Sequence, residues 1–200
     1  MGSTIKKEFF GIYFVIPTIL FLLNNKFVTL LSFYGVTLFV VYKLKYEEKF
    51  CFAALLKKVD WAYCFFFFII FLISGYLYTY ALDESLLLNF PRESFFVWLI
   101  VMFIYPFLSV IPQEIIFRVF FFSRYKTYFL NKNIFLVVIN SIVFSFCHIV
   151  FNNLHALVIT GIVSPIFAHA YINKSFLTCV VIHTLGGQII FTLGLGKYFF

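Results

Sequence analysis

The stretch FFVWLIVMFIYPFLSVIPQEIIFRVFFFS, residues 95–123, decides the fold class of this chain. Its only charged residues are Glu114 and Arg118, and both lie inside apolar sequence of the kind that spans a lipid bilayer. A charged residue at mid-bilayer costs about 2.5–3.5 kcal/mol on insertion scales, so such residues are rare and often functional. The two are four residues apart and therefore share one face of a helix. We expect a buried ion pair that either orients helices or takes part in chemistry.

The composition of the whole chain supports a membrane protein. Of its 200 residues, 64% are hydrophobic and 12% are charged, whereas about 25% of a soluble domain is charged. We predict an all-α fold, a polytopic membrane helical bundle that forms a single integral membrane domain over residues 1–200. The net charge of +7 comes mainly from lysines in short connections, which indicates topology signals and contacts with membrane lipids, and no nucleic-acid partner. The four cysteines form no CxxC pair, so neither disulfides nor a cysteine metal site is expected.

The number of spans depends on residues 95–129. Apolar stretches occur at 9–23, 27–42, 61–82, 95–110, 113–130, 133–150, 155–172 and 175–195. As one helix, residues 95–129 would be about 52 Å long, against a hydrocarbon core of about 30 Å. Pro106 and Pro112 are break points for a helix. We therefore predict about eight transmembrane helices, with seven as the alternative in which 95–129 is a single span.

The basic residues predict the orientation of the chain. With eight spans, one side of the membrane holds the N-terminus and Lys6, Lys7, Lys43, Lys45, Lys49, Lys57, Lys58 and Lys197. The other side holds Lys26, Arg92, Arg124, Lys126, Lys132 and Lys174. The positive-inside rule then places the N-terminus in the cytoplasm, and seven spans give the same orientation. We expect an integral protein of a bacterial inner (plasma) membrane. Residues 43–61 are either an interfacial amphipathic helix or a solvated connector.

Two histidines can complete a polar site with Glu114. His148 lies near the end of the stretch 133–150, and His183 lies inside 175–195. A glutamate and a histidine can share a water and remove its proton, while a second histidine donates to the developing oxyanion. Alternatively, Glu114, His148 and His183 would bind a divalent metal such as zinc that activates the water. We favour water activation without a cofactor.

Three short motifs around these residues carry a resemblance to a known family. They read QEIIFR at 113–118, FSFCH at 144–148 and HTLGG at 183–187. In order and spacing they resemble the CPBP family of CAAX proteases and bacteriocin-processing enzymes, also called the abortive-infection family, whose helices carry EExxxR, FxxxH and HxxxN. The similarity covers residues 95–195, the family-like catalytic core. It implies an intramembrane endopeptidase that cleaves a peptide or membrane-protein substrate near the cytoplasmic face.

Two positions depart from the family pattern. Gln113 stands where the family has its water-activating glutamate, and an amide cannot act as a general base. Gly187 stands where the family has an asparagine that assists the oxyanion, and glycine has no side chain to donate. The resemblance therefore leaves Glu114 as the base, with Arg118 holding it in place. The candidate replacement donors are Asn152, Asn153 and Gln188.

The two departures keep a second function class open. A catalytically inactive scaffold or immunity-type protein of the same family would bind a peptide or partner in the former active site. The retention of four polar residues in apolar sequence favours the enzyme. A third class is a proton-coupled carrier with a Glu–His relay, but the chain shows no repeat symmetry. The sequence names neither the substrate nor the oligomeric state.

Overall fold

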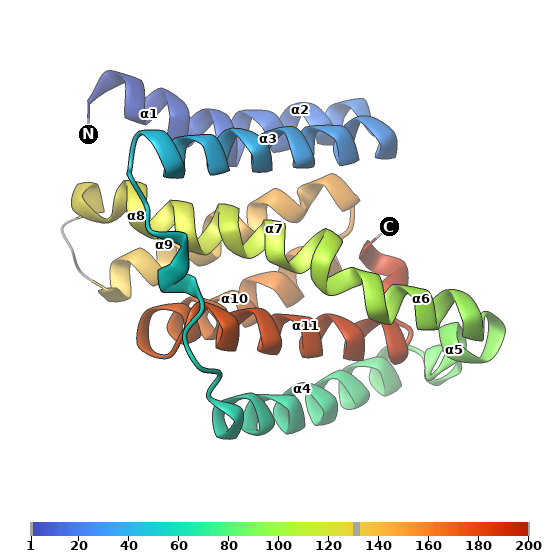
Figure 1. Ribbon diagram of the computed structural model, residues 1–200. Coiled ribbons are helices and arrows are strands. Elements are labelled where there is room, and N and C mark those ends of the chain that lie inside the picture. Colours follow the sequence, from blue (N-terminus) through green and yellow to red (C-terminus); the bar gives the residue numbers. More distant parts are fainter. Residues whose placement is uncertain (1, 130–132, 200) are drawn as a thin grey trace. The chain divides into compact units, whose positions relative to one another are not determined.

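The computed structural model describes residues 2–129 and 133–199, and these residues are helical with no strands (Figure 1). Five helices are long and apolar enough to cross a membrane: Lys26–Tyr46, Trp61–Leu82, Phe95–Tyr128, Ile134–Phe151 and Leu154–Asn173. The predicted all-α polytopic bundle is therefore confirmed. Lys132, which entered the charge comparison, lies outside the described residues.

The predicted division of residues 95–129 into two spans is wrong, because Phe95–Tyr128 forms one helical stretch of 34 residues. The two prolines widen this helix without ending it. Pro106 begins a π-helical turn, η4 (Pro106–Val110), and a second one, η5 (Ile115–Phe120), follows shortly after Pro112. Such local widening lets the backbone carbonyls that a proline leaves without a hydrogen bond find other partners inside a membrane helix.

Two further apolar stretches accompany the five long helices. At the N-terminus, α1 (Ser3–Phe10), η1 (Gly11–Val15) and α2 (Ile16–Leu23) follow one another without a break. Near the C-terminus, α11 (Phe176–Thr192) has 17 residues. Neither is among the five helices that are long and apolar enough to cross a membrane, so the number of spans stays a prediction. In the segment 43–61, residues 43–46 end α3 (Lys26–Tyr46) and Trp61 begins α4 (Trp61–Leu82). The part between these helices contains the short 3-10 turn η2 (Phe52–Leu55) and no α-helix, so it is a connector and not an amphipathic helix.

The chain divides into two compact units, which we describe separately. Unit 1 comprises Met1–Ala53 and Pro112–His169, and unit 2 comprises Ala54–Ile111 and Ala170–Phe200. In unit 1, η1 contacts α9 (Asn133–Cys147) and α2 contacts η7 (His148–Phe151), while α3 contacts η5. The remaining helical segments of unit 1 are α3 (Lys26–Tyr46), α7 (Ile111–Glu114), α8 (Phe121–Tyr125), η6 (Lys126–Phe129), α9 (Asn133–Cys147), η7 (His148–Phe151) and α10 (Leu154–Asn173).

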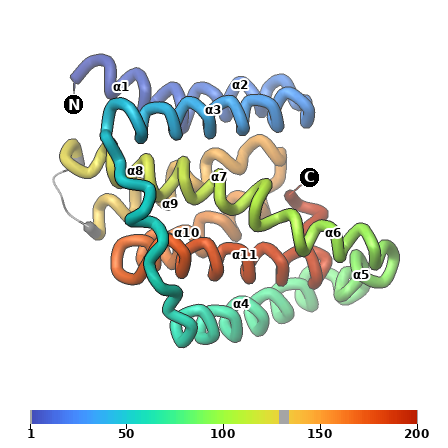
Figure 2. Tube along the Cα trace, in the orientation of Figure 1, coloured from blue at the N-terminus to red at the C-terminus, as the bar shows by residue number. Residues whose placement is uncertain are grey.

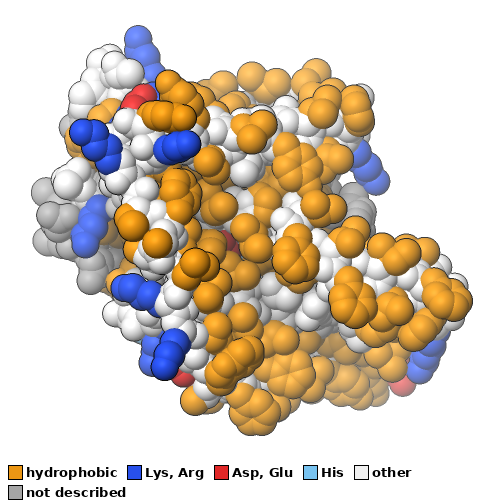
Figure 3. All heavy atoms as spheres, in the orientation of Figure 1, with side chains coloured by type: hydrophobic (Ala, Val, Ile, Leu, Met, Phe, Trp, Pro, Cys, Tyr) orange, Lys and Arg blue, Asp and Glu red, His pale blue; other side chains and the backbone are white. Residues whose placement is uncertain are grey.

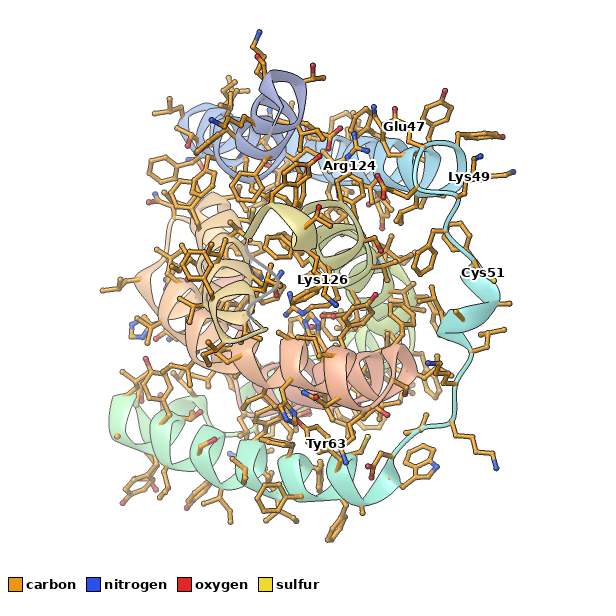
Figure 4. The ribbon with its side chains drawn as sticks, turned by 90° about the vertical axis from the view of Figure 1, so that its left-hand side faces the viewer. Glu47, Lys49, Cys51, Tyr63, Arg124 and Lys126 are labelled. Atoms are coloured by element: carbon orange, nitrogen blue, oxygen red, sulfur yellow. The ribbon has the colours of Figure 1, made fainter. Side chains whose placement is uncertain are left out.

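Charged side chains of unit 1 meet around Arg124 at the end of α8. The Arg124 guanidinium pairs with Glu8 of α1 at 3.0 Å and with Glu47 and Glu48, just after α3, at 2.9 and 2.6 Å. Figure 4 shows Arg124 and Glu47 close together beside the end of α3. The Tyr125 hydroxyl also donates to Glu8, at 3.0 Å. This network ties three helix ends of unit 1 together and gathers charge at one end of apolar helices.

Unit 2 is built on the pairing of α4 (Trp61–Leu82) with α11, which lie side by side (Figures 1 and 2). Gly75 allows close packing there, since an added Cβ would lie 3.1 Å from Leu193 Cδ1. The Trp98 indole N–H donates to Thr192 Oγ1 at 3.1 Å, and this hydrogen bond attaches α6 (Phe95–Tyr105) to α11. The other segments are η3 (Glu84–Leu86), α5 (Asn89–Glu93), α6 (Phe95–Tyr105), η4 and η8 (Leu195–Phe199).

Many large hydrophobic side chains of unit 2 are exposed, as a lipid-facing surface requires. On α6, Phe96 is 78% exposed and Phe103 is 70% exposed. Figure 3 shows hydrophobic side chains covering the visible surface of α6 with few charged groups among them. Patches of this extent are unusual on soluble monomers and mark interaction or membrane surfaces. The surface therefore agrees with the membrane assignment.

Asp60 joins α4 to α11 through three contacts, and removing it is expected to destabilise unit 2. Its carboxylate caps α4 by accepting from the Tyr63 N–H at 3.0 Å and pairs with Lys174 at 2.8 Å. Its own N–H donates to Thr178 Oγ1 at 2.9 Å. We expect Asp60→Ala to lower the thermal unfolding temperature more than Asp60→Asn, because asparagine keeps the cap and loses only the ion pair.

The same contacts predict a pH dependence. The Lys174 ammonium and the Tyr63 N–H hold the pKa of Asp60 below its usual value. A lowered folded-state pKa stabilises the fold above the unfolded-state pKa, and this contribution is lost as the pH falls through the folded-state value. Thermal unfolding between pH 3 and 7 measures it. An Asp60→Asn curve as steep as wild type over the acidic range would contradict the assignment.

Candidate active site

Glu114 and Arg118 form a fully buried ion pair in unit 1. The Glu114 Oε2 and Arg118 Nε atoms are 3.4 Å apart, and both side chains are 0% exposed. Glu114 ends α7 and Arg118 lies in the π turn η5. The predicted i,i+4 pair is therefore confirmed in its geometry. A buried ion pair is retained only where further contacts compensate the loss of water around both charges.

Side chains from two other helices supply those contacts to Arg118. Its Nη2 donates to Ser164 Oγ of α10 at 3.3 Å. The guanidinium carbon lies 4.7 Å from the ring centroid of Phe144 and 5.9 Å from that of Phe167. Aromatic faces attract cations, and more strongly where water is absent. Arg118 is thus held in one position, and it presents its charge to Glu114.

His148 is held in a single tautomer by its own helix. Its Nδ1 lies 2.7 Å from the carbonyl oxygen of Phe144, one turn earlier. A carbonyl only accepts, so Nδ1 carries the hydrogen, and in a neutral ring Nε2 then has the lone pair. The Phe144 ring lies 4.7 Å from the His148 ring. Phe144 therefore contacts both Arg118 and His148, and His148 presents a basic nitrogen on its other side.

The π turn that carries Arg118 is supported from outside. The Tyr13 hydroxyl of η1 donates to the Ile116 carbonyl at 3.0 Å. The Asn140 side-chain N–H of α9 donates to the Phe117 carbonyl at 2.5 Å. Both acceptors lie inside the turn, where regular helical hydrogen bonding is interrupted. Neither Tyr13 nor Asn140 follows from the motif pattern; a polar side chain in an otherwise apolar span was the only signal for them.

The two asparagines predicted as replacement donors shape the connection between α9 and α10. Asn152 ends η7 with φ 49°, a left-handed conformation that asparagine tolerates. Asn153 Oδ1 accepts from the His155 N–H at 2.8 Å. These are turn-forming roles. Donation from either residue to an oxyanion stays a prediction.

The third motif belongs to unit 2. His183 is buried on α11, and its ring lies edge-on to that of Tyr105, with centroids 6.4 Å apart. Gln188 Nε2 donates to the Met102 carbonyl at 3.0 Å, so one of its two amide hydrogens is used within unit 2. Gly187 is also buried. The structure thus brings Glu114, Arg118 and His148 into unit 1, and His183 into unit 2.

A metal site stays an alternative for these residues. A glutamate and two histidines form a ligand set that zinc enzymes use. Within each unit, the described residues contain no cluster of three His, Cys, Asp or Glu side chains that would form a metal site alone. All four cysteines are free thiols.

Comparison with known proteins gives one match. Residues 94–186 match the family described as type II CAAX prenyl endopeptidase Rce1-like. The matched region contains all three motifs, at 113–118, 144–148 and 183–187, except for the final residue of the third. No curated protein and no solved structure matches the chain.

Proposed function

We propose that this protein, whose residues 94–186 match the Rce1-like family of type II CAAX prenyl endopeptidases, is an intramembrane endopeptidase that uses Glu114 and His148 to activate water. The substrate is a peptide or a membrane protein. The observation that carries the proposal is the buried Glu114–Arg118 pair, linked to His148 by the Phe144 ring, which contacts both Arg118 and His148 within unit 1. An integral membrane location agrees with the apolar helices.

The proposed reaction is ordinary hydrolysis of an amide. A water between the Glu114 carboxylate and His148 Nε2 loses a proton to one of them, and its oxygen forms a bond to the peptide carbonyl carbon. The carbonyl oxygen becomes an oxyanion, which needs hydrogen-bond donors. When the C–N bond breaks, the held proton passes to the leaving amine. The products are a carboxylic acid, which then releases its proton to solvent, and an amine, and no electrons are exchanged.

Arg118 makes Glu114 suitable for this work in spite of Gln113. The Arg118 guanidinium is held by Ser164 and by the rings of Phe144 and Phe167. The Glu114 carboxylate therefore has a positively charged neighbour in a fully buried site. Gln113 can accept or donate a hydrogen bond but cannot take a proton at neutral pH. The proposal therefore assigns the chemistry to Glu114 and leaves Gln113 to orient water or substrate.

Reconstitution with membrane-tethered peptides tests the function. Purified protein in lipid bilayers is incubated with a peptide library carried on a transmembrane anchor, and new termini are identified by mass spectrometry. Cleavage by the wild type that is lost in His148→Ala supports the proposal. Equal cleavage by both proteins would show that His148 takes no part.

Metal dependence is tested with the same assay. We expect cleavage to persist after dialysis against a chelator, because the proposed mechanism gives the proton transfers to Glu114 and His148. Metal analysis of the purified protein provides a readout independent of activity. Stoichiometric zinc, with cleavage lost on chelation and restored by zinc, would overturn the metal-free mechanism.

An inactive scaffold or immunity-type protein is the second candidate, favoured by Gln113 and by the glycine at position 187. It predicts no cleavage by any variant and a membrane protein that co-purifies. We also propose a bacterial inner membrane location with the N-terminus in the cytoplasm. The excess of basic residues in the connections supports this orientation. Accessibility of single cysteines placed near the N-terminus tests it.

A further inference from the structure

Gly187 faces an occupied space. A Cβ added at Gly187 would lie closer than 3.0 Å to the hydroxyl oxygen, Cε1 and Cζ of Tyr105. Real Cβ atoms are essentially never that close to another heavy atom. The end of the Tyr105 side chain therefore occupies the volume that any other side chain at position 187 would need. Both residues belong to unit 2, so this contact lies within one compact unit.

Tyr105 reaches the same face of α11 that carries His183. Positions 183 and 187 are four apart and share one helix face, and the Tyr105 ring also lies edge-on to the His183 ring, with a centroid distance of 6.4 Å. The Phe191 ring, one turn further on, lies 5.2 Å from Tyr105. Three successive turns of α11 thus position the phenol. Its hydroxyl lies at the middle turn, against Gly187.

We propose that the Tyr105 hydroxyl is the hydrogen-bond donor to the oxyanion on the His183 face, in the place where a side chain at position 187 would otherwise project. This rests on the proposed hydrolytic function and names a residue for it. A tyrosine hydroxyl is neutral at pH 7 and donates one hydrogen bond, and tyrosine is among the side chains that line oxyanion holes. Gly187 then has a definite role, which is to make room for the phenol.

A residue exchange tests whether Tyr105 and position 187 compete for one space. Gly187→Asn is expected to lower the thermal unfolding temperature, because the new side chain collides with Tyr105. Tyr105→Ala in the same chain removes the collision, so the double variant Tyr105→Ala/Gly187→Asn is expected to unfold at a higher temperature than Gly187→Asn alone. Gly187→Asn unfolding at the wild-type temperature would overturn the proposal.

Binding of a tetrahedral anion tests donation without requiring turnover. The probe is a membrane-anchored peptide in which a phosphonate replaces the scissile amide, compared with the unmodified peptide. We expect Tyr105→Phe to weaken phosphonate binding about tenfold or more, the loss typical for a hydrogen bond to a charged group. Tyr76→Phe, which removes an exposed hydroxyl on α4, is the matched control and is expected to bind as the wild type does.

The outcomes separate this inference from the proposed function. Tyr105→Phe binding the phosphonate as tightly as the wild type would overturn the donor role, and so would a wild type that does not prefer the phosphonate. Preferential binding that depends on the Tyr105 hydroxyl supports it. If that binding is found but no peptide is cleaved, the oxyanion site stands and the hydrolytic function fails.

Discussion

Replacing Glu114 with glutamine is expected to lower the rate of peptide hydrolysis by about 10²–10⁴-fold, the usual contribution of general acid–base catalysis. Glutamine has nearly the same volume and keeps a polar oxygen at this position, but it cannot take a proton from water. The rate is measured as kcat on a membrane-anchored peptide, with thermal unfolding as a check on the fold. Glu84→Gln, at an exposed position in η3, is the matched control.

The neighbouring position makes this experiment more discriminating. If Glu114→Gln cleaves at the wild-type rate, Glu114 is not the base. A further variant, Gln113→Glu, restores the acidic pair of the family motif. Activity that appears only in Gln113→Glu would mean that the natural chain is an inactive member of its family. Activity in the wild type that Glu114→Gln abolishes would show that a single glutamate is sufficient.

Replacing Arg118 with methionine is expected to destabilise the protein by about 3–5 kcal/mol, the usual cost of removing one partner of a buried ion pair. Methionine fills a similar volume, so the main loss is electrostatic. Glu114 would lose the cation beside it in a fully buried position, and Ser164 and the Phe144 ring would lose their contacts with the guanidinium. Unfolding in mixed micelles with increasing denaturing detergent measures the change.

A double variant separates stability from catalysis. In Glu114→Gln/Arg118→Met both charges are gone, so most of the stability is expected to return while hydrolysis stays absent. Lys6→Met, which removes an exposed cation from α1, is the control for the loss of a positive charge. Equal stability of Arg118→Met and Lys6→Met would show that the ion pair does not hold unit 1 together.

Local sequence was a reliable guide to the fold class and to the contact between Glu114 and Arg118. Composition predicted a helical membrane protein, and the four-residue spacing predicted the Glu114–Arg118 contact, because that spacing brings side chains together on any helix. The count of spans was less predictable. Pro106 reads as a helix break, but in the folded chain the backbone widens into a π turn and continues. Proline has no N–H, so it leaves a backbone carbonyl of the preceding turn without its usual hydrogen bond. Whether the helix ends there or only widens depends on whether that carbonyl finds another partner.

The sequence by itself determined the class of protein, the family motifs and the buried ion pair, since all of these depend on composition or on spacing within one helix. Only the tertiary structure decided what surrounds them. The Ser164 contact joins residues 46 apart in the chain, and the Tyr105 hydroxyl meets Gly187 from another helix. Such contacts depend on how helices pack, and packing is a property of the whole set of side chains. For that reason the sequence showed only a glycine without a side-chain donor, whereas the structure shows that the end of the Tyr105 side chain fills the space beside it.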